Sequence, residues 1–314
     1  MRVVVVGSGM AGLTAARRLT AAGHRVTVVD KGRHPGGRMA TAELAGGARA
    51  DFGAQFVTVR SPELAADLGG WLADGTVHEW CRGFGTDDGH PRYAATGGMR
   101  HLATALARDL DVRQSVHVGA VDRSGDGWTV SWPEGHGAPA GRLEADAVVV
   151  TCPVPQSAAL LGDAAEVPAL AYDATLSLVV ALDGPSSVPA PGGVQPTGDP
   201  VWSWVGENAA KGVSAGPAVT LHTTAALAAE RWDDDDGPLG VELLAAAAPW
   251  LGGAGAVDVR LHRWRFATPV APHPDRCVEV APGAVLAGDA FGGPRVEGAY
   301  LSGLAAADRV AGRG

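Results

Sequence analysis

The chain has 314 residues, of which 46% are hydrophobic and 19% charged, and its formal net charge is −9. This length and composition predict a globular protein with a substantial core, in one large domain or two interleaved smaller ones, and exclude disorder over most of the length. The 25 Lys and Arg residues are outnumbered by 34 Asp and Glu residues, so neither nucleic acid nor an anionic membrane is an expected partner.

The first thirty residues predict a β-α-β unit. Residues 3–6 are a continuous β-branched run, which is typical of a strand covered on both faces in a parallel sheet. A helix is expected over residues 10–22, because apolar residues recur there at three-residue steps and Gly23 can end it. With a second strand at residues 25–30, the pattern indicates a doubly wound α/β sheet.

The rest of the chain predicts a less regular order of elements. Ser61 and Pro62 indicate the start of a helix, with Trp71 and Leu72 on its buried face. Another helix is expected over residues 98–110, and Pro153 marks a change of domain. Strands are expected at residues 112–118, 120–121, 128–132, 147–150, 176–182, 201–205, 218–222, 257–266 and 284–287, and a final helix at residues 298–310.

The segment Gly7-Ser8-Gly9-Met10-Ala11-Gly12 lies between the first predicted strand and the first helix. Glycines at this place allow a tight turn, the approach of a pyrophosphate and close packing of helix against strand. Asp30 follows Gly12 by 18 residues at the end of the second strand, where its carboxylate can accept hydrogen bonds from an adenosine ribose. The motif predicts a dinucleotide site and by itself does not separate NAD from FAD.

Three further segments resemble the flavoprotein family that includes amine oxidases and renalase: Gly36-Gly37-Arg38, Asp51-Phe52-Gly53-Ala54-Gln55 and Gly288-Asp289. The resemblance implies non-covalent FAD, with Gly37 and Arg38 against its pyrophosphate and Asp289 at its ribityl chain. It also implies that residues 295–299 place a helix N-terminus near the flavin, where N–H groups and the helix dipole stabilise negative charge. Together, the expected cofactor-binding residues are Gly7, Gly9, Met10, Ala11, Gly12, Asp30, Lys31, Gly37, Arg38, Asp51, Phe52, Gly53, Ala54, Gln55, Val116, Thr151, Gly288, Asp289, Glu297, Gly298 and Ala299.

Within that family the chain is most similar to bacterial renalase-like proteins. The segments that carry this likeness are residues 37–41, 51–56, 96–99, 204–211, 221–223, 262–267 and 288–303. The chain departs from the pattern at Gly212-Val213-Ser214, at Ala226-Leu227 and at Ala290. The resemblance implies a Rossmann-type FAD-binding domain made of residues 1–60, 96–155 and 283–314, and a discontinuous α+β substrate domain made of residues 61–95 and 156–282.

Trp204, His222 and Asn208 are the candidate catalytic residues. Trp202 and Trp204 stand two apart on a predicted strand, so we expect both on one face, either as a flat wall opposite the flavin or as core. His222 on its strand is either a polar group in the cavity or a structural residue. Asn208 and Lys211 follow on a loop, where they either bind a substrate carbonyl or phosphate or are solvated. No catalytic base is identified.

Three functions fit these observations. No second dinucleotide motif follows a later strand, so an electron donor must reach the flavin through the substrate cavity. The first hypothesis is a renalase-like oxidase that takes hydride from dihydronicotinamide isomers and passes electrons to oxygen. The second is a tailoring oxidase or dehydrogenase for an amine or another small metabolite, and the third is a flavin-binding protein without turnover.

Cysteine spacing and hydropathy bear on location and metals. Cys81, Cys152 and Cys277 form no C-x-x-C pair, which favours a reducing, cytoplasmic compartment. No stretch reaches the roughly 20 apolar residues that span a bilayer, and the N-terminus does not read as a cleavable signal, so no membrane anchor is expected. Asp87-Asp88, His90 and residues 233–236 match no metal-site spacing, so we expect hydrated surface there.

Overall fold

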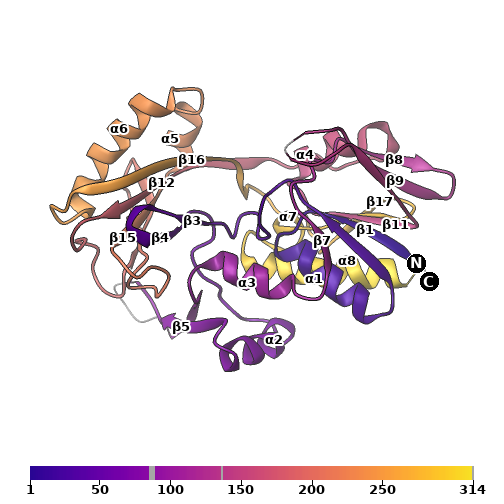
Figure 1. Cartoon of the computed structure of the whole chain (residues 1–314), viewed down its shortest axis with the longest axis horizontal. Coiled ribbons are helices and arrows are strands. Elements are labelled where there is room, and N and C mark those ends of the chain that lie inside the picture. The colour runs from indigo at the N-terminus through magenta and orange to yellow at the C-terminus, as the bar shows by residue number, and fades with distance from the viewer. Residues whose placement is uncertain (85–88, 136, 313–314) are drawn as a thin grey trace.

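The computed structural model describes residues 1–84, 89–135 and 137–312. Two lobes lie side by side, one around a six-stranded sheet and the other around a five-stranded sheet, and the chain passes between them several times (Figure 1). The N-terminus and the end of the last helix lie together in the first lobe. The six-stranded sheet has the order β17 (Val278–Ala281), β18 (Ala284–Leu286), β11 (Ala147–Val150), β1 (Arg2–Val6), β2 (Arg25–Val29) and β7 (Asp111–Arg113).

Strand β1 lies near the middle of this sheet and pairs in parallel with β11 and β2. Val3 and Val5 pack against helices α1 (Met10–Ala21) and α8 (Val296–Ala311) on one face. Val4 and Val6 pack on the other face, which is covered by a small antiparallel sheet and a helix. These are β8 (Ala120–Ser124), β9 (Gly127–Trp132), β10 (Gly141–Ala145) and α4 (Val154–Leu161). The predicted β-α-β unit and its burial on both faces are confirmed.

Helices α1 and α8 approach each other closely at a glycine. A Cβ added at Gly303 would lie 2.3 Å from the backbone oxygen of Ala11, so this position has no room for a side chain. The contact joins the first and last helices of the chain behind the same sheet (Figure 1).

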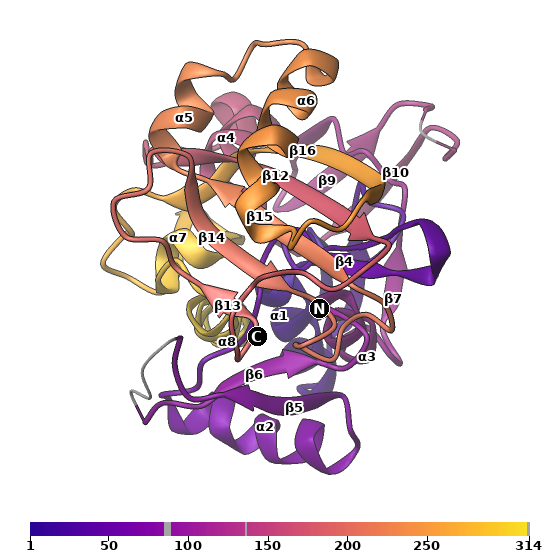
Figure 2. The same ribbon diagram turned by 90° about the vertical axis from the view of Figure 1, so that its left-hand side faces the viewer.

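The five-stranded antiparallel sheet forms the second lobe (Figure 2). Helices α5 (Ala225–Glu230) and α6 (Asp236–Ala247) pack on one of its faces. The other face meets the hairpin of β3 (Thr41–Glu43) and β4 (Arg49–Asp51). The sheet order is β13 (Gly193–Val194), β14 (Trp202–Glu207), β15 (Ala218–Thr223), β12 (Tyr172–Leu182) and β16 (Ala256–Pro269).

Helix α2 (Pro62–Ala73) begins where the sequence predicts, but its buried face differs. Leu64 and Leu68 are buried and Trp71 packs partly beside them, whereas Leu72 is 41% exposed. Leu72 follows Leu68 by one turn, at the end of α2, and the packing that buries Leu64 and Leu68 does not extend to it. The expectation that Leu72 is buried is therefore wrong.

Several boundaries also differ from those expected. The strand predicted over residues 112–118 ends at Arg113, because Ser115 takes a φ of 61° and turns the chain. Strand β17 pairs with β18 in the six-stranded sheet, so the C-terminal part of the chain returns to this sheet before residue 283, where the return was expected. The division of the chain into two domains stays a prediction. The remaining strands and α-helices of the described residues are β5 (Val77–Cys81), β6 (Arg92–Ala95), α3 (Met99–Leu106) and α7 (Asp289–Gly292).

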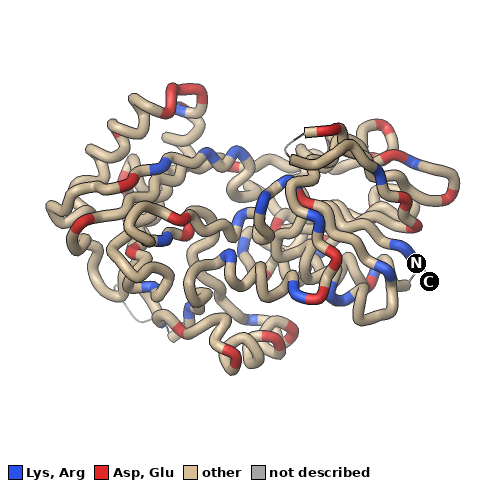
Figure 3. Tube along the Cα trace, viewed as in Figure 1, with Lys and Arg blue, Asp and Glu red and all other residues tan. Residues whose placement is uncertain are grey.

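Charged residues of both signs are distributed over both lobes (Figure 3). Residues 233–236, where hydrated surface was expected, are all exposed and lead into α6. Among the described residues, none of the helices is both long and apolar enough to cross a membrane.

Candidate functional site

The glycine-rich turn between β1 and α1 is ordered by backbone contacts. The amide of Gly7 donates to the carbonyl of Val29 at 2.8 Å, and the amide of Gly36 donates to the carbonyl of Ser8 at 2.8 Å. The first amides of α1, at Met10, Ala11 and Gly12, lie at the helix N-terminus, where intrahelical partners are lacking and the helix dipole is positive. The turn therefore presents an anion-binding helix end.

Two glycines of this turn are needed for different reasons. A Cβ at Gly12 would lie 1.9 Å from the backbone oxygen of Gly7, so Gly12 permits the close packing of α1 against the turn. A Cβ at Gly9 would come no nearer to protein than 3.8 Å, at the oxygen of Gly36. Protein packing therefore does not require a glycine at position 9. The open space there is a cradle that a side chain would fill, and it suits the pyrophosphate of a dinucleotide.

Asp30 lies at the end of β2, beside the glycine turn. Its carboxylate accepts hydrogen bonds from the amides of Ser8 and Gly32, each at 2.6 Å, through different oxygens. Nearby, Gln114 donates to the hydroxyl of Ser8 at 3.3 Å, and its buried Oε1 has no partner among the described residues. Each Asp30 oxygen retains acceptor capacity, so the residues beside the turn fit the hydroxyl groups of a ribose.

Arg38 and Asp289 join the two segments that were expected to meet the pyrophosphate and the ribityl chain. Their side chains form a bidentate ion pair with distances of 2.5 and 2.7 Å. Arg38 also donates to the carbonyls of Phe266 and Ala267 on β16. The pair thus lies where β16 of the second lobe meets the start of α7, and Gly37 stands beside it in sequence.

The corner between α7 and α8 is held by glycines and by Glu297. A Cβ at Gly298 would lie 2.2 Å from the oxygen of Gly293, so the corner requires its glycine. The Oε1 atom of Glu297 accepts hydrogen bonds from the amides of Arg60 and Ser61 and from the Ser61 hydroxyl, at 2.7 to 2.8 Å. Glu297 therefore orders the start of α2 through its side chain, and Ala299 follows within the first turn of α8.

Four other expected cofactor residues line the same region. The Thr151 hydroxyl donates to the carbonyl of Val6 at 2.9 Å, at the end of β11. Val116 is buried, and its amide donates to the carbonyl of Asp30. Gly288 donates its amide to the hydroxyl of Ser302 in α8, and Lys31 is exposed. Direct contact of each of these residues with FAD stays a prediction.

The segment of residues 51–55 connects the two lobes through a buried ion pair. Lys211 and Asp51 are both fully buried, with their charged groups 3.3 Å apart, and Lys211 also donates to Gln55 Oε1 at 2.9 Å. Burial lowers the pKa of Lys211, and the Asp51 carboxylate opposes this shift. Gly53 approaches the backbone of Arg38 so closely that an added Cβ would lie 2.0 Å from its oxygen. This ion pair therefore fastens the segment that follows β4.

Asn208 is also part of this connection. Its amide nitrogen donates to the Ala218 carbonyl and the Thr220 hydroxyl, and its oxygen accepts from the amide of Asp51. Asn208 and Lys211 are fully buried. Both side chains are thus hydrogen-bonded to protein groups. The alternative that they are solvated on a loop is therefore wrong. The expected catalytic role of Asn208 stays a prediction.

Trp202 and Trp204 lie on opposite faces of β14, which corrects the expectation that they share one. Trp202 pairs with Thr223, and Trp204 pairs with His222. Between these two pairs β14 advances by two residues while β15 advances by one. This β-bulge inserts one residue and reverses the alternation of side chains. Trp202 packs in the core beneath α6, with its indole nitrogen 3.4 Å from the carbonyl oxygen of Ala246.

Trp204 belongs to an aromatic cluster on the other face of the sheet. Its ring centroid lies 5.0 Å from Phe84, 5.8 Å from Phe56 and 6.4 Å from Trp80. The guanidinium of Arg92 lies 4.6 Å from the centroid of the Phe84 ring. Phe56 directly follows the segment fastened by Lys211, so the cluster joins this segment to β14.

A polar row crosses the same face of the sheet. Trp204 on β14 pairs with His222 on β15, which pairs with Ser177 on β12, which pairs with His262 on β16. Paired residues project from the same side of a sheet. In this row, Trp204 Nε1, His222 Nε2 and Ser177 Oγ are buried and have no hydrogen-bond partner in the described part of the chain. Burial lowers the pKa of His222 to about 4, so its imidazole is neutral at neutral pH.

Phe52 covers one end of the row. Its ring stacks on Trp264 with centroids 5.4 Å apart and meets His262 edge-on at 4.9 Å. The Trp264 indole nitrogen donates to the Phe52 carbonyl at 2.7 Å. Phe52 and Phe56 therefore lie at opposite ends of the row, beside His262 and Trp204 respectively.

The structure adds residues that sequence reasoning missed. Ser177, Gln114 and the cluster members Phe56, Trp80 and Phe84 were not singled out for chemistry. Ser177 is the one polar residue in the apolar run of residues 176–182, and that is the signal from which it could have been found. The role of the others depends on contacts between distant segments.

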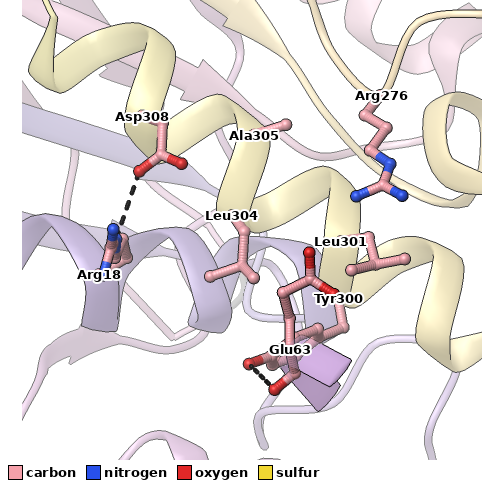
Figure 4. Close-up of a pocket in the computed structure, with 8 residues that line it drawn as sticks. All are labelled: Arg18, Glu63, Arg276, Tyr300, Leu301, Leu304, Ala305 and Asp308. Carbon is pink, nitrogen blue, oxygen red and sulfur yellow. Dashed lines mark hydrogen bonds and ion pairs between the residues drawn. The ribbon is translucent and has the colours of Figure 1, made fainter. Parts of the chain in front are cut away.

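A groove of about 380 Å³ lies elsewhere, between α1, α2 and α8 (Figure 4). Its wall includes the Arg18–Asp308 ion pair and Tyr300, whose hydroxyl donates to Asp67. It shares no lining residue with the cradle or the polar row. Over residues 1–84, 89–135 and 137–312, no group of His, Cys, Asp and Glu could hold a metal ion. Asp87 and Asp88 lie outside the described residues.

Comparisons with known proteins match the chain to dinucleotide-binding and flavoprotein families. A family profile described as "NAD(P)-binding Rossmann-like domain" matches residues 5–68, and one described as "Flavin containing amine oxidoreductase" matches residues 68–311. Phytoene desaturase (neurosporene-forming) of Rhodobacter capsulatus is 51% identical over 70 residues, which are 22% of this chain and 13% of that protein. Polyamine oxidase 1 of Oryza sativa subsp. japonica is 49% identical over 75 residues, 22% of this chain and 14% of its own length.

Solved structures share the fold over the whole chain at low identity. A putative protoporphyrinogen oxidase from Exiguobacterium sp. 255-15 gives a TM-score of 0.70 at 14% identity, over 100% of this chain and 99% of that one. A double mutant of putrescine oxidase gives a TM-score of 0.68 at 15% identity, over 100% of both chains.

Proposed function

Because this chain belongs to the flavin-containing amine oxidoreductase family, for which FAD is the implied cofactor, we propose that it is an FAD-dependent oxidase or dehydrogenase of a small planar substrate. The more specific proposal is a renalase-like oxidation of dihydronicotinamide isomers, with oxygen as the electron acceptor. It is supported by the likeness of residues 204–211, 221–223 and 262–267 to renalase-like proteins.

The observation that carries the proposal is the character of the sheet face that bears Trp204. This face offers aromatic rings and uncharged polar atoms, while the carboxylates near it are engaged. Asp51 accepts from Lys211, Thr41 and the amide of Met99. Glu207 accepts from the amides of Ala210 and Ala218. Aromatic rings also attract cations, but Arg92 and Lys211 already lie at the rings of Phe84 and Trp80. A flat, uncharged ring therefore fits this face better than a further cation, such as an amine, does.

The residues of this chain have separable tasks in that reaction. FAD, when bound, supplies the acceptor of two electrons from the substrate. The N-terminus of α1 and Asp30 bind the dinucleotide, and Arg38 with Asp289 orders the junction where β16 meets α7. Trp204 and Phe56, whose rings are tilted by 48° to each other, present an apolar wall that orients a ring and excludes water. Hydride transfer from an electron-rich carbon depends on such positioning more than on a base.

A second candidate is a tailoring oxidoreductase that acts on an amine or another metabolite. It is favoured by the departures at residues 212–214, 226–227 and 290. The polyamine oxidase and putrescine oxidase named among the similar proteins point to amines as the first class to test. A flavin-binding protein without turnover is the third candidate.

Anaerobic stopped-flow reduction separates these candidates. The FAD-loaded protein is mixed with NADH isomers, putrescine and benzylamine, and the flavin absorbance is followed. We expect fast bleaching by a dihydronicotinamide isomer, slow or no bleaching by the amines, and recovery of absorbance with formation of hydrogen peroxide when oxygen is admitted. Bleaching by an amine alone would support the tailoring enzyme. No bleaching by any donor would leave the flavin-binding protein as the remaining reading.

A further inference from the structure

Three unpartnered polar atoms in one buried row call for a ligand. A buried polar group without a partner costs about 1 to 3 kcal/mol, so folded proteins retain few of them without a reason. Ser177 is fully buried and Trp204 is 6% exposed, yet Ser177 Oγ and Trp204 Nε1 have no partner within the described residues. Ser177 and Trp204 lie on either side of His222, whose buried Nε2 also has no hydrogen-bond partner within the described residues.

We propose that Ser177, His222 and Trp204 form a hydrogen-bonding strip that recognises an uncharged amide group on the substrate, with Ser177 as a specificity-determining residue. This inference rests on the proposed function, in which the substrate lies against this sheet face.

The donors and acceptors of the strip match an amide. The Trp204 indole offers only a donor, so it requires an acceptor such as a carbonyl oxygen. The Ser177 hydroxyl offers both a donor and an acceptor. The neutral imidazole of His222 is also bonded to the Phe52 backbone, which leaves its Nε2 to accept a hydrogen bond. A planar carboxamide presents one strong acceptor and two N–H donors in one plane, which fits three groups carried by neighbouring strands.

Charge around the strip disfavours a cationic group. The nearby ammonium of Lys211 lowers the pKa of His222 further, after the larger effect of burial. The carboxylates of Asp51 and Glu207 are already bonded to protein donors. In the part of the chain that the structure describes, the strip thus has no spare carboxylate to neutralise an ammonium ion, and an unpaired buried charge is costly.

Binding of two small ligands of matched size tests the proposal without turnover. Benzamide and benzylamine are titrated into the FAD-loaded protein, and binding is followed by the change in flavin absorbance and by the shift in melting temperature. We expect benzamide to bind more tightly than benzylamine. Ser177→Ala should weaken benzamide binding by about tenfold, the factor that corresponds to the loss of one hydrogen bond.

Ser157→Ala is the matched control. Ser157 is 1% exposed on α4, and its hydroxyl donates to the carbonyl of Cys152 at 3.0 Å. We expect this control to keep the wild-type affinity for benzamide and to lower the melting temperature of the ligand-free protein. Ser177→Ala should leave that melting temperature unchanged or raise it, because it removes a hydroxyl without a partner.

Three results would overturn the proposal: no saturable binding of benzamide, tighter binding of benzylamine, or an unchanged benzamide affinity in Ser177→Ala. A loss of stability in Ser177→Ala equal to that of the control would also overturn it, because the hydroxyl would then have a partner within the protein. None of these results depends on flavin bleaching. The proposal for the strip can therefore be refuted while the proposed oxidation stands, and the proposed oxidation can be refuted while the proposal for the strip stands.

Discussion

The buried pair of Lys211 and Asp51 predicts a large and specific response to Lys211→Met. Methionine keeps an unbranched apolar side chain of similar length but removes the ammonium group. In the variant, Asp51 loses the donor at 3.3 Å and Gln55 loses the donor at 2.9 Å, while both groups remain buried. Lys211 and Asp51 are 160 positions apart in sequence, so their contact is one of those that hold β4 against the second lobe.

The size of the effect follows from the burial of both partners. Both side chains are 0% exposed, so water cannot replace the lost donor unless the structure opens. Removing one member of a buried ion pair costs about 3 to 5 kcal/mol, because the other charge stays in a poorly polarisable environment. Asp51 retains its bonds from Thr41 and from the amide of Met99. We therefore expect a loss of about 3 kcal/mol in the free energy of unfolding, near the lower end of this range.

Urea unfolding followed by tryptophan fluorescence measures this loss. The double variant Lys211→Met/Asp51→Asn removes both charges, so its loss should be smaller than the sum of the two single losses, with a coupling of about 0.5 to 3 kcal/mol. Lys31→Met, at an exposed lysine, is the control and should change stability little. A loss below about 1 kcal/mol in Lys211→Met, or additive losses in the double variant, would refute the reasoning.

Three other predictions concern the cradle, the sheet and pH. Gly9→Ala should leave the apoprotein folded but reduce the FAD content of the purified protein. Gly12→Ala, whose Cβ would lie 1.9 Å from a backbone oxygen, should lower the melting temperature of the apoprotein itself. Equal melting temperatures of the two apoproteins would contradict the assignment of Gly12 to packing and Gly9 to the cradle. Trp202→Ala and Trp204→Ala should each cost about 3 to 5 kcal/mol, because both indoles are buried, but only Trp204→Ala should also slow reduction of the bound flavin in the fraction that stays folded; slowed reduction in Trp202→Ala alone would place the wall on the wrong face. The pKa of His222 falls from 6.5 to about 4 on folding, so the unfolded chain takes up a proton at a higher pH than the folded protein does. The free energy of unfolding should therefore decrease as the pH falls from 6.5 to about 4, by about 3 kcal/mol in total. His222→Gln should flatten this part of the pH profile of urea unfolding, and an unchanged profile would show that the imidazole is not shielded.

Much of the cofactor half of the protein was predictable from sequence because its signals are local. A run of four valines, a glycine spacing and an acidic residue at the next strand end are all contained in thirty residues, and each has a direct stereochemical meaning. The signal for the helix that begins near Ser61 is equally local. The structure retains all of these features. It adds that Gly12 serves packing while Gly9 leaves space open, a distinction that the motif alone does not contain.

The substrate half depended on tertiary structure, because its decisive features are relations between strands. Alternation along β14 predicts Trp202 and Trp204 on one face, but a bulge is created by the pairing with β15 and separates them. The strip of Ser177, His222 and Trp204 exists only because β12, β15 and β14 are neighbours in that register. The sequence by itself determined the dinucleotide fold and the candidate residues. Which of them face a common space was decided by strand register and long-range burial, since neither is set by residues adjacent in the chain.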